Sequence, residues 1–173
     1  MSELDKYLVD LKGMTTDVET HQWQLGNEFF ECVQGAEIQQ GQVSVQLTVK
    51  RSSSAYNIGI ELEGVVRVQC DRCLEMMEQP IRGTGSLRIV LGDEYADDGE
   101  LVTVPFESGV LNTAWHIYEA IALALPLRHV HPDGQCDSVM QQALSAHTPE
   151  EESDDERPTD PRWNELKKIL NKQ

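Results

Sequence analysis

The sequence predicts an α+β fold in which an antiparallel β-sheet, which can take a barrel-like form, is covered by one main helix. Apolar and polar residues alternate with a period of two through the middle of the chain, as in strands that bury one face. The period becomes helical at residues 112–125, and a short amphipathic helix follows a strongly acidic stretch near the end. We therefore expect an α+β domain over residues 1–147, an acidic linker over 148–159 and a C-terminal helix over 160–173.

The strand pattern is strongest between residues 43 and 91. With two shorter candidates before it and one after it, we expect strands over residues 7–11, 21–25, 43–49, 58–70, 81–91 and 101–104. In the longest of these strands apolar residues occupy every second position, interrupted only by Gly64. A glycine inside a strand is typical of a bulge or bend. Gly83 and Gly85 leave gaps in the following strand, where a neighbouring element can pack closely.

Two helices are expected after the strands. The main helix runs from an N-cap at Asn112 to a stop at Pro126. It is apolar on most sides, so we expect it to lie against the sheet. In the C-terminal helix, Asp160 is a typical N-cap and Pro161 occupies the first helical position. The apolar stripe of this helix is expected to bind a partner or its own domain, and it consists of Trp163, Leu166 and Leu170.

The formal net charge is −16, with acidic runs at residues 93–100 and 150–160. Nucleic-acid binding over a whole surface depends on cations that neutralise phosphates, so this charge argues against it and favours a basic partner protein. We interpret both runs as solvated loops or linkers. The start of the chain lacks the pattern of a signal peptide, and no segment is apolar for long enough to cross a bilayer. We therefore expect a cytoplasmic protein without membrane contact.

The four cysteines should stay reduced in that compartment. Two of them form a Cys-x2-Cys pair at the end of the longest strand, and their thiols converge if the chain turns between them. A structural zinc needs two further ligands, which the segment His-Val-His-Pro-Asp-Gly-Gln-Cys after the main helix can supply. The predicted metal ligands are Cys70, Cys73, Cys136 and His131, with His129 as the alternative histidine.

Two other interpretations of the Cys70 and Cys73 pair stay open. The thiols can be reduced structural groups that fill the end of a strand. They can also form a redox pair, which requires a helix N-terminus that lowers the pKa of a thiol; residues 74–80 are too short for a convincing helix. Cys32 is assigned to the core.

The sequence contains no glycine-rich phosphate loop, no Ser/His/Asp order and no His-Glu-x-x-His. We therefore expect no enzyme activity and no small-molecule substrate. One feature indicates RNA contact, because the alternation places four cations on the polar face of the sheet: Lys50, Arg67, Arg82 and Arg88. Glu61 and Glu63 share that face and offset the positive charge, so a solvated sheet face is the alternative interpretation.

The order of these features resembles the YceD family of bacterial and plastid proteins. The resemblance rests on the long alternating strand, on Cys-Asp-Arg-Cys-Leu-Glu at residues 70–75, on the apolar helix that ends in Leu-Ala-Leu-Pro-Leu at 123–127, and on a late cysteine. The segment at 160–170 is similar to the C-terminal helix of Bacteroidetes-type members. Many relatives carry a second cysteine pair after the proline of the helix, whereas this chain has one cysteine and two histidines there.

Membership implies a non-enzymatic role in the accumulation or maturation of large-subunit ribosomal RNA. The implied partners are a ribosomal protein or a ribosome-assembly factor, and direct contact with a large-subunit ribosomal RNA precursor stays open. The cofactor expected from the cysteines is one structural zinc or none. Two alternative functions stay open: a zinc-stabilised protein–protein adaptor that does not contact RNA, and a thiol redox protein that uses the Cys70 and Cys73 pair.

Overall fold

The computed structural model describes residues 3–99 and 101–148. The chain divides into two compact units, residues 1–137 and residues 138–173. The second unit contributes one described helix, α3 (Ser138–His147), which the sequence pattern did not predict. The linker from residue 149 onward and the predicted C-terminal helix, with its Trp163, Leu166 and Leu170 stripe, lie outside the described residues.

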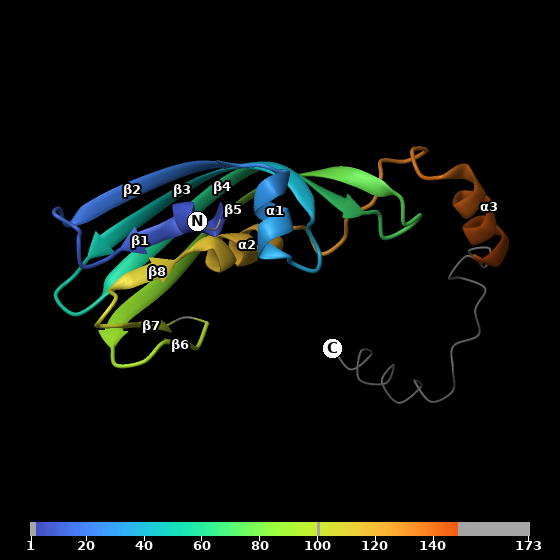
Figure 1. Cartoon of the computed structure of the whole chain (residues 1–173). Helices are drawn as coiled ribbons and strands as arrows, with labels where there is room; N and C mark the ends of the chain where they lie inside the picture. The colour runs from blue at the N-terminus through green and yellow to red at the C-terminus, as the bar shows by residue number, and fades with distance from the viewer. Residues whose placement is uncertain (1–2, 100, 149–173) are drawn as a thin grey trace, which may run out of the picture. The chain divides into compact units, whose positions relative to one another are not determined.

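The first unit is built on a six-stranded sheet (Figure 1). Its strands, in spatial order, are β2 (Val18–Leu25), β3 (Gln40–Arg51), β4 (Tyr56–Gln69), β5 (Met76–Gly92), β7 (Leu101–Pro105) and β6 (Ala96–Asp97). Neighbouring strands are antiparallel except β5 and β7, which run parallel. The predicted α+β class is confirmed. Among the described strands the sheet stays open, with β2 and β6 at its ends, so it does not form a closed barrel.

Short elements from both ends of this unit lie beside the sheet. They are the 3-10 helix η1 (Glu3–Tyr7), β1 (Leu8–Asp10), α1 (Asn27–Val33), β8 (Val110–Asn112) and α2 (Ala114–Leu123). β1 pairs with β8 in a two-stranded sheet. Figure 1 shows α1 and α2 under the arch formed by the long strands. No helix of the described part of the chain is long and apolar enough to cross a membrane.

The core lies between the long strands and the helices. From Ile58 to Val68 the side chains of β4 alternate between the core and the exposed face, with the glycine at 64 partly buried, as the sequence pattern predicts. From the other side α2 contributes Ile117 and Ile121, which are fully buried. Each side chain of this size contributes about 1.5–3 kcal/mol when it leaves water. Burial of this kind fixes α2 on the sheet.

The start of α2 agrees with the predicted cap to within one residue. The helix begins after Thr113, and the Asn112 side-chain oxygen accepts a hydrogen bond from the Ala114 N–H at 3.0 Å. The Thr113 hydroxyl is buried and donates to the Tyr7 carbonyl oxygen at 2.8 Å. This contact joins the beginning of the chain to the helix that covers the sheet.

Three glycines mark places where a neighbour approaches the sheet closely. A Cβ on Gly83 would lie 2.7 Å from the Ala124 Cβ, and one on Gly85 would lie 3.2 Å from the Ala120 Cβ. Both glycines therefore admit α2, as predicted. Of the bulge or bend expected at Gly64, the bulge is wrong, because the pairing register continues through this residue on both sides. A Cβ there would collide with the β3 backbone, so this glycine permits close strand approach instead.

The assignment of Cys32 to the core is also wrong. Cys32 is exposed, because it lies in α1, a helix that the sequence pattern did not predict. That helix turns Phe29 and Phe30 into the core and leaves the cysteine on its outer side.

Candidate metal centre

Cys70 and Cys73 lie in a tight turn that joins β4 to β5. The Leu74 N–H donates to the Cys70 carbonyl oxygen, and the Cys70 N–H donates to the Glu75 carbonyl oxygen, both at 2.9 Å. The Arg72 N–H donates to the Cys70 Sγ at 3.4 Å. Cys70 is 0% exposed and Cys73 is 5% exposed. The chain thus turns between the cysteines, as predicted, and both thiols face inward.

The residue that follows the second cysteine has a strained backbone. Leu74 has a φ of 63°, in the left-handed region that costs a residue with a Cβ roughly 1–2 kcal/mol. Its side chain is 61% exposed, so burial does not compensate. Strain of this kind concentrates at functional sites, where the surrounding structure holds it in place. Here it returns the chain to β5 immediately after Cys73.

Asp71 attaches the segment after α2 to this turn. Its N–H donates to the His129 carbonyl oxygen at 2.9 Å, and its carboxylate accepts from the His129 N–H at 2.8 Å. The His129 ring contacts the same carboxylate, with Nε2 at 3.5 Å from Oδ1. These contacts bring His131 and Cys136 to the turn, and the His131 N–H donates to the Cys70 Sγ at 3.4 Å.

Four side chains from the two segments form one cluster: Cys70, Cys73, His131 and Cys136. Their ligand atoms all lie within 4.8 Å of one another. The Sγ atoms of Cys70 and Cys136 are 3.9 Å apart, and the His131 Nδ1 lies 3.3 Å from the Cys73 Sγ and 4.0 Å from the Cys136 Sγ. In a tetrahedral zinc site with Zn–S bonds of about 2.3 Å, ligand atoms are about 3.5–3.8 Å apart. The spacing of this donor set fits a zinc ion.

The cluster contains His131, and the alternative histidine is elsewhere. The His129 ring lies against the Asp71 carboxylate and the Pro126 carbonyl oxygen, where its Nδ1 is 3.4 Å from that oxygen. Cys136 is 7% exposed, so all three sulfur atoms are shielded from water. The set consists of three buried cysteines and one partly buried histidine. Four protein ligands are the arrangement of structural zinc sites, whereas catalytic sites keep one position open for water or substrate.

The electrostatic environment differs among the thiols. Burial raises the pKa of the Cys70 thiol, but the backbone N–H groups of Cys73, His131 and Arg72 outweigh burial and lower it to about 5. Burial raises the pKa of the Cys136 thiol, and the neighbouring Cys73 and Cys70 raise it further. A divalent cation among these sulfur atoms favours the thiolate form of each of them.

Asp71 is the residue of this site that sequence reasoning missed. It stands inside the Cys-Asp-Arg-Cys segment, and its partner lies 58 residues further along the chain. Local spacing carries no signal for such a contact. The role of Asp71 follows only from its contacts with the backbone of His129, which the sequence does not show.

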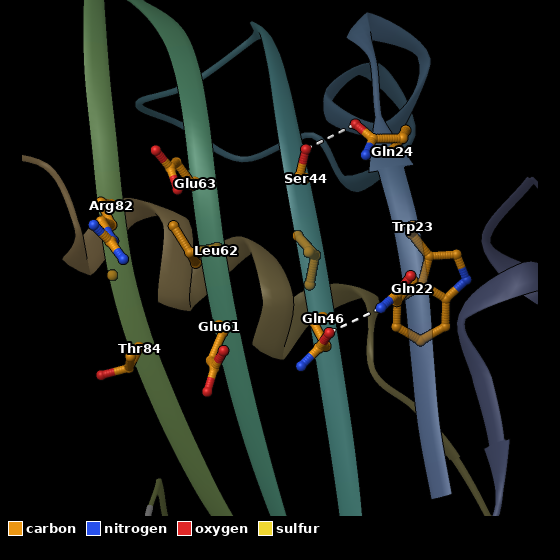
Figure 2. Close-up of a pocket in the computed structure, with 12 residues that line it drawn as sticks. Gln22, Trp23, Gln24, Ser44, Gln46, Glu61, Leu62, Glu63, Arg82 and Thr84 are labelled. Carbon is orange, nitrogen blue, oxygen red and sulfur yellow. Dashed lines mark hydrogen bonds between the residues drawn. The ribbon is translucent and has the colours of Figure 1, made fainter.

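The predicted RNA-contacting cations are all exposed on the outer face of the sheet: Lys50, Arg67, Arg82 and Arg88. Polar side chains of β2, β3, β4 and β5 line a shallow groove on this face. Figure 2 shows the groove from outside, with Arg82 next to Glu63 and the helix ribbon behind the strands. This face is therefore separate from the core and from α2.

Carboxylates share the outer face with these cations. Arg82 lies directly opposite Glu63, and Arg67 lies opposite Glu78. Opposite charges on neighbouring strands attract each other, so two of the arginines are offset by an adjacent acid.

The remaining two cations form a different row. Lys50 and Arg88 lie on either side of Asn57, one on β3 and one on β5. Among the described residues this is the row of the sheet in which two cations flank an uncharged side chain.

Comparison with known proteins places the chain in a family. No curated protein and no solved structure matches it. The family model described as large ribosomal RNA subunit accumulation protein YceD matches residues 58–170. The match covers more than half of the 173 residues and includes most of β4 and both segments of the cluster. The chain therefore belongs to the YceD family.

Proposed function

We propose that this protein is a non-enzymatic factor that supports the accumulation of large-subunit ribosomal RNA, and that a structural zinc ion stabilises its fold. The observation that carries the proposal is the cluster of Cys70, Cys73, His131 and Cys136, which lies inside the matched region 58–170. The family model is described by that accumulation role. A closed four-ligand site supplies rigidity and offers no position for a substrate.

Metal analysis of the full chain tests the zinc part of the proposal. The purified protein is expected to contain one zinc ion per chain, and the Cys73→Ser and Cys136→Ser variants are expected to lose it. The matched control is Cys32→Ser, because Cys32 is exposed on α1 and lies outside the cluster. A wild-type protein purified in the presence of zinc that still contains none contradicts the proposal.

The cellular role is tested with the same variants. In cells whose only copy carries Cys73→Ser, the ratio of large-subunit to small-subunit ribosomal RNA is expected to fall, whereas Cys32→Ser leaves the ratio unchanged. Equal ratios in cells with and without the protein reject the role in ribosomal RNA accumulation, whatever the metal content is.

The protein can act through contacts with other proteins alone or through direct contact with RNA, and these two modes predict different crosslinks. RNA contact is favoured by the exposed row of Lys50 and Arg88, because phosphate binding depends on such cations. If RNA lies on this face, Lys50→Glu with Arg88→Glu reduces ultraviolet crosslinking to ribosomal RNA. The control that changes charge equally is Lys6→Glu with Lys12→Glu. Equal crosslinking in both double variants argues that RNA does not lie on the outer face.

Thiol redox function is disfavoured by burial. Cys70 and Cys73 are almost inaccessible, whereas a redox cysteine must meet its substrate disulfide. Alkylation of both thiols in the native protein is expected to be slow, and alkylation of Cys32 to be fast. Rapid modification of Cys70 at neutral pH reverses this conclusion.

A further inference from the structure

A second chemically distinct surface lies where α2 meets the turn before β6. Two aromatic side chains are exposed there, Tyr95 at 56% and Trp115 at 49%. The Trp115 Nε1 donates to the Glu119 Oε1 at 2.7 Å. Burial raises the pKa of Tyr95, and the nearby charges of Asp97 and Glu119 raise it further. We call Tyr95, Asp97, Trp115 and Glu119 the α2 surface.

A buried histidine connects the two carboxylates of this surface. His116 is 4% exposed, and its Nδ1 lies 3.5 Å from the Glu119 Oε2 while its Nε2 lies 4.0 Å from the Asp97 Oδ2. The side chains of Glu119 and Asp97 remain 47% and 30% exposed. A carboxylate has about four lone-pair sites, so each keeps acceptor capacity toward solvent. Neither has a Lys or Arg partner within the described part of the chain.

The indole of Trp115 is held in place before any ligand arrives. Its ring stacks on Tyr118, with centroids 5.5 Å apart and an angle of 26° between the planes. The Tyr118 hydroxyl in turn accepts the N–H groups of Glu37 and Ile38, both at 3.2 Å. A side chain that is already ordered loses little conformational entropy when a partner binds.

These features suit a cationic ligand. Carboxylates accept two parallel hydrogen bonds from a guanidinium group, and the faces of Trp and Tyr rings attract cations. Trp and Tyr also dominate the energetics of many protein interfaces. The acidic run at residues 93–98, which contains Tyr95 and Asp97, adds to the negative potential. The same potential repels a phosphate backbone, so this surface suits a basic protein and not RNA.

We propose that the α2 surface binds an arginine-containing basic segment of a partner protein, with a guanidinium group at Glu119 between Trp115 and Tyr95. The inference rests on the proposed function in one respect, since it specifies the class of protein partner through which that function operates. It uses residues that are separate from the zinc ligands and from the outer face of the sheet.

The test is a titration of the purified, ¹⁵N-labelled full chain with a synthetic nonapeptide of alternating glycine and arginine. The indole N–H signal of Trp115 and the amide signals of Tyr95 and Glu119 are expected to shift. The Glu119→Gln variant keeps the size of the side chain and is expected to bind about tenfold more weakly, because one charge-assisted hydrogen bond is lost. The matched control Glu61→Gln removes an exposed acid from the outer face and is expected to change binding less than about twofold.

Three results overturn the proposal: no binding of the peptide, equal weakening in Glu61→Gln and Glu119→Gln, or shifts confined to residues 150–160. The last two show that net charge alone attracts the peptide. If Glu119→Gln disturbs folding, the test uses Trp115→Phe instead, which keeps an aromatic ring against Tyr118. This variant is also expected to bind the peptide more weakly. Peptide binding is measured without reference to ribosomal RNA, so its failure leaves the zinc and ribosomal RNA measurements unaffected, and their failure leaves the peptide result unaffected.

Discussion

Removal of the metal is the perturbation that tests the cluster most directly. A zinc ion bound by both segments links Cys73 to His131 and Cys70 to Cys136, across 58 and 66 residues of chain. Treated as a covalent cross-link that closes a loop of this length, it removes conformational entropy from the unfolded chain worth about 4 kcal/mol. For a protein of this size each kcal/mol shifts the melting temperature by about 2–4 °C. Chelation is therefore expected to lower the melting temperature by about 8–16 °C.

The assay is differential scanning calorimetry of the full chain before and after exhaustive dialysis against a chelator, with zinc measured in each sample. Returning one equivalent of zinc restores the original melting temperature. The Cys32→Ser protein shows the same loss and the same recovery. If the zinc content falls to zero while the melting temperature drops by less than about 3 °C, the cross-link argument is refuted, because the cluster then binds zinc without stabilising the fold.

Three further predictions concern the free energy of unfolding, measured with urea. In the metal-free chain the folded pKa of Cys70 is about 5, against an ordinary value of 9.0. The Cys70 thiolate therefore contributes fully to the free energy of unfolding above pH 9, and this contribution is lost as the pH falls through 5. Cys70→Ser should flatten this dependence of stability on pH. Gly83→Ala places a methyl group 2.7 Å from the Cβ of Ala124, the residue that follows α2, and should cost about 1–3 kcal/mol. The control is Gly59→Ala, because no atom lies within 4 Å of a Cβ added there, and it should change the free energy of unfolding by less than about 0.5 kcal/mol. Equal effects of the two alanine substitutions refute the packing argument. Tyr118→Phe leaves two backbone N–H groups without their acceptor and should cost about 1–3 kcal/mol, while Tyr95→Phe on the exposed surface serves as the control.

The features that sequence predicted well are those in which one segment determines its own structure. In β4 the alternation of apolar and polar residues corresponds to a buried and an exposed face of the strand. The turn after Cys70 could be predicted because a strand that continued would place Cys73 on the opposite face from Cys70. The four residues of the cluster could be grouped because one short segment after the main helix contains two histidines and a cysteine. His131 could be separated from His129 only by the structure, because the Asp71 contact decides between them.

The features that sequence missed depend on contacts between distant segments or on weak local patterns. The parallel pairing of β7 with β5 leaves no trace in the periodicity of either strand, since alternation reports faces and not neighbours. α1 is only seven residues long, too short for a helical period to stand out, and this hid the exposed position of Cys32. The buried His116 was not recognised because its carboxylate neighbours come from α2 itself and from a two-residue strand.

The separation of the ligands along the chain determines when the metal site can be completed during synthesis. Cys73 leaves the ribosome 63 residues before Cys136 (136 − 73), which corresponds to roughly 3–13 s at ordinary rates of translation. During that interval the cluster is represented at first by Cys70 and Cys73 alone, while β5, β7 and α2 are still being made. Coordination of one ion by all four residues of the cluster therefore requires that translation has passed the whole sheet and its covering helix.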